Sequence, residues 1–217
     1  MSAPDVYRTA RGPLPRVVEP LAQRARARRH ARFVALFEPG PQTRILDVGC
    51  GAIGLRGLAP DLDITGVDLV APPGYPGPFV LADASAQLPF ADGEFDLAYC
   101  SSVIEHVPPP RRAVFAAEVR RVARGWYVQT PARSFPIEPH SLLPAAHWLP
   151  RWLRRRYWRL GASGVWEDVE LLSRAELEAL FGPAEAERFG PFTKSWISAR
   201  PVPPRPPAAA CGGSSGD

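Results

Sequence analysis

The sequence has few cysteines, one lysine and no long apolar run. Cys50, Cys100 and Cys211 lie far apart, the chain has no CxxC pair and no HExxH motif, and its four histidines show no metal-ligand spacing. A disulfide framework and a metal site are therefore not expected. No stretch approaches the roughly 18 apolar residues of a membrane-spanning helix, and the N-terminal segment lacks the apolar core of a secretory signal. These absences favour a cytoplasmic protein.

The composition supports one globular domain with an uneven distribution of charge. The 217 residues are 46% hydrophobic and 22% charged, which is enough to build a sizeable core. Residues 45–110 contain nine acids and one base, whereas residues 111–160 contain eleven bases and two acids. A nucleic-acid-binding protein usually has one continuous basic face, and an acidic ligand segment repels a phosphate backbone. No nucleic-acid partner is therefore expected.

Proline content and charge divide the chain into parts. Residues 1–40 form a basic N-terminal segment, with a helix predicted over residues 14–38. Residues 41–200 form the main domain, into which a proline-punctuated cap is inserted at about 131–172. Residues 201–217 are rich in Pro, Ala, Gly and Ser and are predicted to be a disordered tail.

Short apolar runs alternate with helical patterns in the main domain. A helix is predicted over residues 111–123, and Ser173 with Glu176 forms a capping box for another helix that ends at Phe181. The alternation predicts an α/β fold with a mostly parallel sheet, helices on both faces and ligands at the carboxyl ends of the strands. The expected strands are residues 44–48, 64–67, 79–82, 95–100, 126–130, 184–189 and 193–200.

Three successive strand ends carry residues suited to an adenosine cofactor. Gly49, Gly51 and Gly54 follow the first strand as G-x-G-x-x-G, which lets the backbone turn tightly and approach a ligand closely. Asp68 ends the second strand, where a carboxylate can accept both ribose hydroxyls. Asp83 ends the third strand, where the carboxylate or the neighbouring backbone can meet an adenine edge. Each aspartate alone is often only a helix cap or a turn residue, but all three strand ends match together.

Two adenosine cofactors, NAD(P) and S-adenosylmethionine, fit this arrangement. Asp47 precedes the glycine turn, where a dinucleotide-binding fold normally has an apolar residue. The acidic segment suits a cationic sulfonium better than a pyrophosphate, and the only lysine, Lys194, is not part of a Tyr-x-x-x-Lys pair. S-adenosylmethionine is favoured. An NAD(P)-dependent oxidoreductase and a regulatory protein that binds the cofactor without catalysis stay as alternatives.

The joint motif set resembles the class I S-adenosylmethionine-dependent methyltransferases, in particular the small-molecule branch that includes quinone-biosynthesis enzymes. The motifs are ILDVGCGAIG, ITGVDL, LADASAQLPFADGEFDLAYCSSVIEHV and the late strand ending TKSWIS. The resemblance covers roughly residues 30–130 and 173–200 and implies a Rossmann-like, seven-stranded sheet whose last strand is antiparallel. The chain departs from the pattern D-x-G-x-G-x-G because Ile53 holds the last glycine position, with Gly54 following.

This resemblance implies a set of cofactor contacts. Asp47, Gly49 and Gly51 would contact the methionine end, and Asp68 would hold the ribose. The remaining expected contacts are Leu69, Asp83 and Ala84 at the adenine and the backbone carbonyl of Ser101 at the methionine amine.

Candidates for action on a methyl acceptor follow the fourth strand and lie in the cap. His106, in SSVIEHV, would lie near the transferred methyl group, where it could be a general base or could simply pack. His140 stands in the cap with Glu138 and His147 among aromatic residues and prolines, and it is the second candidate catalytic residue. The predicted function is methyl transfer to a small-molecule or lipid-like acceptor.

Two arginine-rich helices have an open role. In the helix predicted over residues 149–160, an apolar side carries Leu149, Trp152, Leu153, Tyr157 and Leu160. Arginines lie off that side, and a second arginine run occupies residues 24–32. Both helices could be packed or solvated, or they could contact an anionic membrane or an acidic partner.

Overall fold

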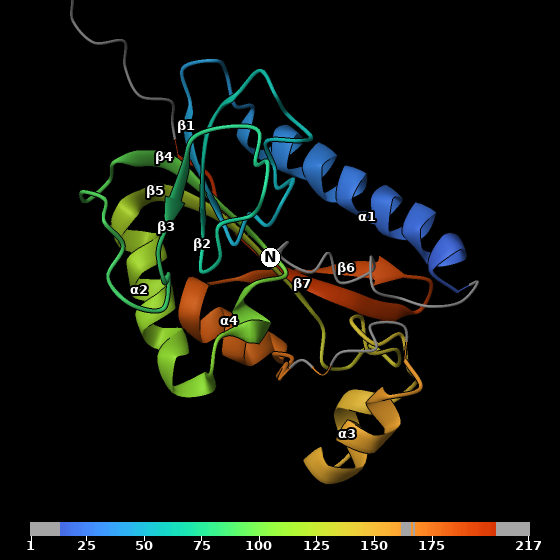
Figure 1. Ribbon diagram of the computed structural model, residues 1–217. Helices are drawn as coiled ribbons and strands as arrows, with labels where there is room; N and C mark the ends of the chain where they lie inside the picture. The colour runs from blue at the N-terminus through green and yellow to red at the C-terminus, as the bar shows by residue number, and fades with distance from the viewer. Residues whose placement is uncertain (1–13, 162–165, 167, 203–217) are drawn as a thin grey trace, which may run out of the picture.

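The computed structural model describes residues 14–161, 166 and 168–202, with side chains described from residue 23 onward. Its centre is a seven-stranded sheet of order β3-β2-β1-β4-β5-β7-β6 (Figure 1). The first five strands run parallel to one another, and β7 runs antiparallel to both of its neighbours. The strands are β1 (Arg44–Val48), β2 (Asp63–Asp68), β3 (Phe79–Leu81), β4 (Phe95–Ser101), β5 (Ala123–Pro131), β6 (Ala184–Phe189) and β7 (Phe192–Arg200).

The described helices comprise four α-helices and three single-turn 3₁₀ helices. The capping box predicted at Ser173 is confirmed, because its hydroxyl accepts from the backbone N–H of Glu176 while the Glu176 carboxylate accepts from the backbone N–H of Ser173. The helices are α1 (Leu14–Phe37), η1 (Ile104–His106), η2 (Pro109–Arg111), α2 (Arg112–Val122), η3 (Ala146–Trp148), α3 (Arg151–Trp158) and α4 (Arg174–Phe181).

The strand positions confirm the apolar pattern, with differences of three residues or fewer at the ends. The antiparallel direction of β7 has a local cause. Only Gly190 and Pro191 separate β6 from β7, and a two-residue connection can join only antiparallel strands. Gly190 takes a φ of +57°, which a residue without a side chain adopts at little cost.

The first three crossovers differ from the expected alternation of strands and helices. Among the described residues, only the β4–β5 crossover, which contains α2, brings an α-helix between consecutive parallel strands. The connector after β1 contains Gly54, Gly57 and Pro60, and the connector over residues 69–78 contains four prolines. Glycine and proline disfavour helix interiors, so these connectors fold as turns.

Helices nevertheless cover both faces of the sheet, as predicted (Figure 1). Successive strand residues alternate between two hydrophobic clusters, so that Leu97 and Tyr99 face one layer while Ala98 and Cys100 face the other. Phe33 of α1 is fully buried in the first layer, and its ring lies edge-on to Tyr99 at 5.2 Å between centroids. The N-terminal helix therefore packs on the sheet. The opposite layer is filled from α2 and α4 by Phe115, Val119, Leu177 and Phe181.

The cap follows β5 and ends at α4, and its helix α3 is shorter than expected. Trp158 is buried against Trp166, with ring centroids 5.2 Å apart, and this contact decides which side of α3 faces the protein. Trp152 and Leu160, which the sequence placed on the apolar side, are 63% and 77% exposed. No described helix has both the length and the apolar content to cross a membrane. Residues 203–217, most of the expected tail, lie outside the described residues.

Candidate functional site

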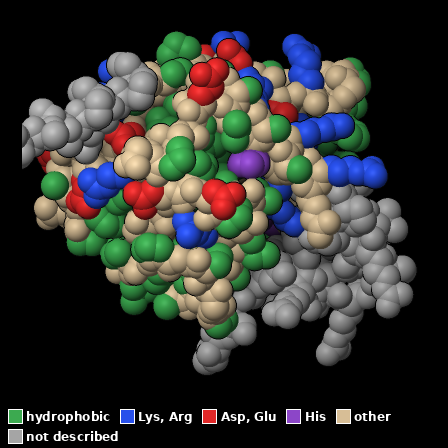
Figure 2. Space-filling model, turned by 90° about the horizontal axis from the view of Figure 1, so that it is seen from above, with side chains coloured by type: hydrophobic (Ala, Val, Ile, Leu, Met, Phe, Trp, Pro, Cys, Tyr) green, Lys and Arg blue, Asp and Glu red, His purple; other side chains and the backbone are tan. Residues whose placement is uncertain are grey.

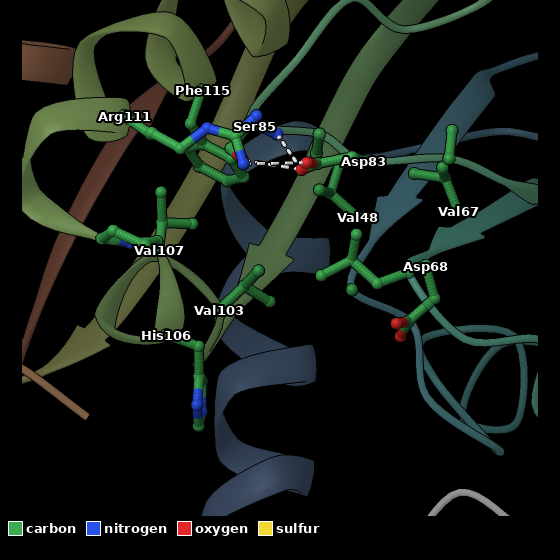
Figure 3. A pocket seen from close by; sticks show the side chains of 15 residues that line it. Val48, Val67, Asp68, Asp83, Ser85, Val103, His106, Val107, Arg111 and Phe115 are labelled. Atoms are coloured by element: carbon green, nitrogen blue, oxygen red, sulfur yellow. Dashed lines mark hydrogen bonds and ion pairs between the residues drawn. The ribbon is translucent and has the colours of Figure 1, made fainter. Parts of the chain in front are cut away.

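A pocket opens at the carboxyl ends of β1, β2 and β3, where the sequence predicted ligand binding (Figure 3). It measures about 580 Å³, counting the part open to solvent. Two carboxylates and one arginine stand among mostly apolar side chains. The lining residues are Val48, Gly49, Val67, Asp68, Leu69, Ala82, Asp83, Ala84, Ser85, Val103, His106, Val107, Pro108, Arg111 and Phe115.

The glycine turn after β1 forms one wall of this pocket. Gly49 takes a φ of +67°, and a Cβ added there would lie 2.4 Å from a methyl carbon of Val103. Its N–H donates to the carbonyl of Val67 at 2.8 Å, which ties the turn to β2. The N–H of Gly51 donates to Oδ2 of Asp68 at 2.9 Å. The predicted ribose ligand therefore also holds the glycine turn in place.

Asp47 lies beneath the turn and does not line the pocket. Its side chain is 3% exposed, and Oδ2 accepts a 2.6 Å hydrogen bond from the backbone N–H of Leu55. Burial raises the pKa of Asp47 to about 7. A Cβ at Gly54, whose φ is +57°, would lie 2.2 Å from Oδ2 of Asp47. Position 54 therefore requires glycine, because the buried Asp47 carboxylate occupies the space of a side chain.

Asp83 reaches across the mouth of the pocket toward η2 (Figure 3). Its Oδ1 accepts from the hydroxyl of Ser85 at 2.6 Å and from the Ser85 N–H at 2.8 Å. Its Oδ2 pairs with the Arg111 guanidinium at 3.2 Å. The Ser85 hydroxyl, followed by the Ser85 N–H and Arg111, lowers the pKa of Asp83. Asp83 is thus an ionised group at the expected adenine end.

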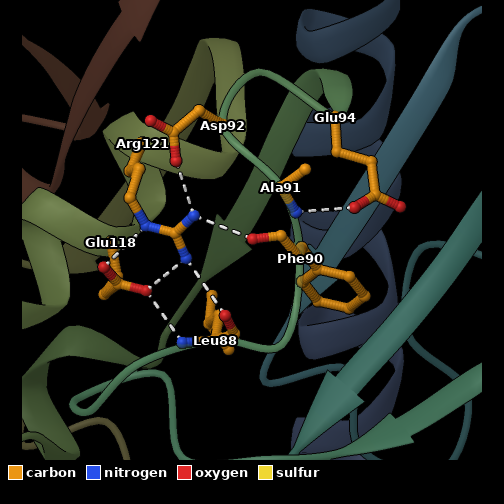
Figure 4. A network of polar contacts seen from close by, with 7 residues as sticks. All are labelled: Leu88, Phe90, Ala91, Asp92, Glu94, Glu118 and Arg121. Atoms are coloured by element: carbon orange, nitrogen blue, oxygen red, sulfur yellow. Dashed lines mark hydrogen bonds and ion pairs between the residues drawn. The ribbon is translucent and has the colours of Figure 1, made fainter.

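The loop that carries Asp83 is fixed at its far end by Arg121 of α2 (Figure 4). The guanidinium donates to the carbonyls of Leu88 and Phe90 and to the carboxylates of Asp92 and Glu118. Glu118 also accepts from the N–H of Leu88 at 2.7 Å. This network holds the β3–β4 loop against α2, and thereby positions one side of the pocket.

A second polar cluster lies next to the pocket, where β4 and β5 end. Glu105 of η1 is 1% exposed, and its Oε2 accepts from the Thr130 hydroxyl at 3.0 Å. Its Oε1 has no hydrogen-bond partner among the described residues. Burial raises the pKa of Glu105. The turn into η1 is strained, because Ser102 takes a φ of +60° while its hydroxyl donates to Gln129.

The cap contributes His140 and Glu138 to this cluster. Nδ1 of His140 lies 2.8 Å from Oε1 of Glu138. Oε2 of Glu138 accepts from the backbone N–H of His140 and from the hydroxyl and N–H of Ser141. Although burial alone would raise the pKa of Glu138, the hydrogen bonds from His140 and Ser141 lower it. A buried carboxylate therefore orients the His140 imidazole.

His106 joins the cluster to the pocket. Its ring lies edge-on to the His140 ring at 4.9 Å between centroids, and the same side chain lines the pocket beside Val103. The His106 side chain is exposed at the pocket wall, but the surrounding protein partly desolvates its ring. This desolvation, followed by the neighbouring His140, lowers the pKa of His106 to about 4, so the ring is neutral at pH 7. The structure thus brings together the two histidines that the sequence named as catalytic candidates.

The predicted contacts fall into two groups. Those that line the pocket are Gly49, Asp68, Leu69, Asp83, Ala84 and His106. The others do not line it. Asp47 and Gly51 make hydrogen bonds that hold the glycine turn behind the pocket wall. Ser101 ends β4 and its hydroxyl donates to Oε1 of Gln129, and His140 lies in the second cluster. Sequence reasoning gave no role to Val103, Arg111 or Phe115; Val103 lies within the motif SSVIEHV, whereas Arg111 and Phe115 belong to no motif. Ser85 could have been found, since a serine two residues after an aspartate is typical of a side-chain turn.

Comparison with known proteins agrees with this geometry. Residues 46–125 match a family described as a methyltransferase domain. A 2-methyl-6-phytyl-1,4-hydroquinone methyltransferase of Synechocystis is 33% identical over 124 residues, which are 51% of this chain and 34% of that protein. The match thus spans about a third of the length of this curated relative.

Solved structures share the fold over a larger part of the chain. The magnesium protoporphyrin IX methyltransferase of Synechocystis, solved with S-adenosylhomocysteine, has a TM-score of 0.57 and 16% identity, covering 89% of this chain and 90% of that one. The 1,6-didemethyltoxoflavin-N1-methyltransferase of Burkholderia thailandensis has a TM-score of 0.53 and 17% identity, covering 78% and 74%. Residues 46–125 thus resemble a methyltransferase domain, and the chain shares its seven-stranded, Rossmann-like fold with these solved methyltransferase structures.

Proposed function

We propose that the protein transfers a methyl group from S-adenosylmethionine to a small-molecule or lipid-like acceptor. One observation carries the proposal: the pocket joins the glycine turn and the Asp68 and Asp83 carboxylates at one end to His106 at the other. One cavity thus contains the polar residues expected around an adenosine cofactor. It also contains a histidine at the end where the methyl group would be transferred.

The residues present fit this cofactor. The Asp68 carboxylate stands where it can accept ribose hydroxyls, and any Cβ at Gly49 would collide with Val103, so the wall is shaped for close backbone approach. Leu69 is 66% exposed in the pocket, which leaves its apolar surface for an adenine ring. Asp83 and Ala84 lie at the same end. Contacts from Asp47 and Ser101 stay predictions.

The chain's own part in the chemistry is mainly alignment. When bound, S-adenosylmethionine supplies a methyl group that its positive sulfur already activates. The residues of the pocket and the cap then orient an acceptor for in-line approach and exclude water. We propose that the acceptor lies between His106 and the cap, where His106 and His140 act on the group that gains the methyl. The relatives' names, which specify a hydroquinone, a magnesium porphyrin and a toxoflavin precursor, support a small-molecule acceptor.

The separation of cofactor and acceptor sites can be tested with His140→Ala. This variant should keep the affinity for S-adenosylmethionine, because His140 does not line the cofactor pocket. If His140 takes part in deprotonating the acceptor, turnover should fall by roughly 10²–10⁴-fold; if it only orients the acceptor, the acceptor KM should rise instead. Calorimetry gives the affinity, and a panel of hydroquinones and phenols gives the rates.

His147→Ala is the matched control for the cap, since His147 bonds the carbonyl of Arg133 at 3.0 Å and lies outside the cluster. It should retain both turnover and KM. Wild-type kinetics for His140→Ala would remove His140 from the reaction, and equal losses in both variants would mean that the cap acts only as scaffolding.

We also propose that the cap contacts an anionic membrane surface. Trp152 of α3 is 63% exposed, beside the exposed Arg155 and Arg156 of the same helix. Trp148 and Leu160, which lie before and after α3, are 54% and 77% exposed. Exposed tryptophans beside arginines are typical of helices that lie in a lipid headgroup layer.

Sedimentation with lipid vesicles tests this contact. Binding is expected to vesicles rich in phosphatidylglycerol and not to pure phosphatidylcholine, and it should weaken with salt. Trp152→Ala should reduce it, whereas Val114→Ala, which removes an exposed apolar side chain from α2, should not. Equal recovery with both kinds of vesicle, or none with either, would contradict the proposal.

A further inference from the structure

Three side chains that the sequence does not connect by any ligand spacing meet beside the pocket. Glu105, His106 and His140 each offer one ligand atom, and these atoms all lie within 4.8 Å of one another. The first two come from η1, directly after β4, and His140 comes from the cap after β5. Two imidazoles and one carboxylate form a donor set that binds zinc and other first-row divalent ions in proteins.

The Glu105 carboxylate gives an independent reason to expect a ligand here. The side chain is 1% exposed, and Oε2 is bound by Thr130, while Oε1 has no hydrogen-bond partner among the described residues. Leaving a buried carboxylate oxygen without a hydrogen-bond partner costs free energy, so such oxygens in native proteins usually have a partner. A cation held by Glu105 and the two histidines would satisfy it.

The surroundings of the three residues are built as in a metal site. Glu138 holds Nδ1 of His140 at 2.8 Å, and a carboxylate behind a ligating histidine is the usual way to orient the ring for binding through Nε2. The backbone of Glu105 is fixed as well, since its carbonyl accepts from the N–H of Glu170 at 3.0 Å. Arg112 holds the other end of η1 through the carbonyl of Val107.

We propose that Glu105, His106 and His140 bind one divalent transition-metal ion, with Glu138 as the group that orients His140. Three protein ligands leave at least one coordination position, and His106 places that position beside the pocket. The two histidines then serve as ligands and not as general bases.

The metal site adds a role to the proposed methyl transfer and in that respect rests on the proposed function. Metal binding itself can be measured whether or not that function is correct. With an ion bound, an acceptor hydroxyl could occupy the open position, where the ion would lower the pKa of that hydroxyl and the proton would pass to water. The acceptor oxygen would then form the new bond to the methyl carbon while the carbon–sulfur bond breaks and its electron pair stays on sulfur. Metal binding itself needs neither cofactor nor acceptor.

The experiment is calorimetric titration of chelator-treated full-length protein with Zn²⁺ and Mn²⁺, together with visible spectroscopy of the Co²⁺ complex. Wild-type protein should bind one ion per chain. Glu105→Gln and His140→Gln should weaken binding by roughly 100-fold or more, and Glu138→Gln by roughly 10–100-fold as expected for a supporting carboxylate. The Co²⁺ spectrum should lose its imidazole-dependent intensity in His140→Gln.

His30→Gln is the matched control, because His30 lies on α1, outside the cluster. It should bind the ion as the wild type does. Absence of one-to-one binding by the wild type for all three ions, or unchanged affinity in both Glu105→Gln and His140→Gln, would overturn the proposal. If a variant fails to fold by circular dichroism, the wild-type stoichiometry and Co²⁺ spectrum still decide. A protein that binds the metal but never S-adenosylmethionine would contradict the proposed function alone.

Discussion

At the scale of single residues, Asp47 shows how an acid can support a ligand site without touching the pocket. Its buried carboxylate accepts a hydrogen bond from the backbone N–H of Leu55, the residue that follows Gly54 at the end of the glycine turn. Asp68 lies nearby and adds a second negative charge, which also raises the pKa of Asp47. The turn is therefore stabilised by a group that prefers to be protonated.

This preference predicts a pH-dependent stability. The pKa of Asp47 rises from 3.8 to about 7 in the folded state, so the folded chain binds this proton more tightly than the unfolded chain does. The contribution to the free energy of unfolding is complete below pH 4 and is lost as the pH rises through 7. The side chain of an Asp47→Asn variant cannot ionise, so between pH 4 and 8 the wild type should lose about 2–4 kcal/mol relative to that variant.

Urea unfolding at several pH values measures this difference. Because other acids titrate equally in both proteins, the difference between the two curves isolates Asp47. Parallel curves from pH 4 to 8 would show that Asp47 ionises freely in the folded protein.

Residue spacing predicted the carboxylates of the pocket but not their partners. Asp68 ends β2 and Asp83 follows β3 by two residues, so both could be placed at one edge of the sheet from the sequence. Arg111 and Val103 reach the same cavity only through the path of the chain after β4, which no local pattern encodes. The meeting of His106 with His140 depends on how the cap folds back, and sequence spacing alone misses it.

At the scale of elements, the glycine turn offers a matched pair of substitutions. Gly49 and Gly51 both have positive φ angles, which cost an alanine about 1–2 kcal/mol. A Cβ at Gly49 would also lie 2.4 Å from Val103, whereas a Cβ at Gly51 has nothing within 4 Å. Gly49→Ala should therefore lower the free energy of unfolding by about 1–3 kcal/mol more than Gly51→Ala, by the cost of overpacking.

Denaturant unfolding of the two variants measures the gap. Adding Val103→Ala to Gly49→Ala should recover part of the loss, because it removes the colliding methyl groups. Equal losses for Gly49→Ala and Gly51→Ala would mean that the turn and the segment after β4 move apart without cost.

Strands were more predictable than the segments between them. The sequence pattern located β1 and β6 at their observed residues. In β1, four consecutive side chains are buried because the strand is covered on both faces. The apolar stripe expected over residues 149–160 did not identify the packed side of α3. Trp158 is buried and Trp152 is exposed, since contact with Trp166 outweighs the simple apolar stripe.

At the scale of the whole molecule, the uneven charge distribution separates two surfaces. Residues 45–110, with nine acids and one base, supply most of the pocket, and the arginine-rich segments lie in α1 and the cap. On the face seen from above, acidic side chains lie on both sides of an exposed histidine (Figure 2). An acidic pocket favours a cationic ligand through its field, whereas the pyrophosphate of a dinucleotide would be repelled.

Calorimetric titration with S-adenosylmethionine and with NAD tests directly whether this pocket binds S-adenosylmethionine. We expect one S-adenosylmethionine per chain and no measurable heat with NAD. The affinity should fall by roughly 1–3 kcal/mol in Asp68→Ala, because the ribose hydroxyls lose a charged acceptor. Folding of the variant is checked by circular dichroism. Binding of NAD in place of S-adenosylmethionine, or an affinity for S-adenosylmethionine that a folded Asp68→Ala protein retains in full, would contradict this assignment of the pocket.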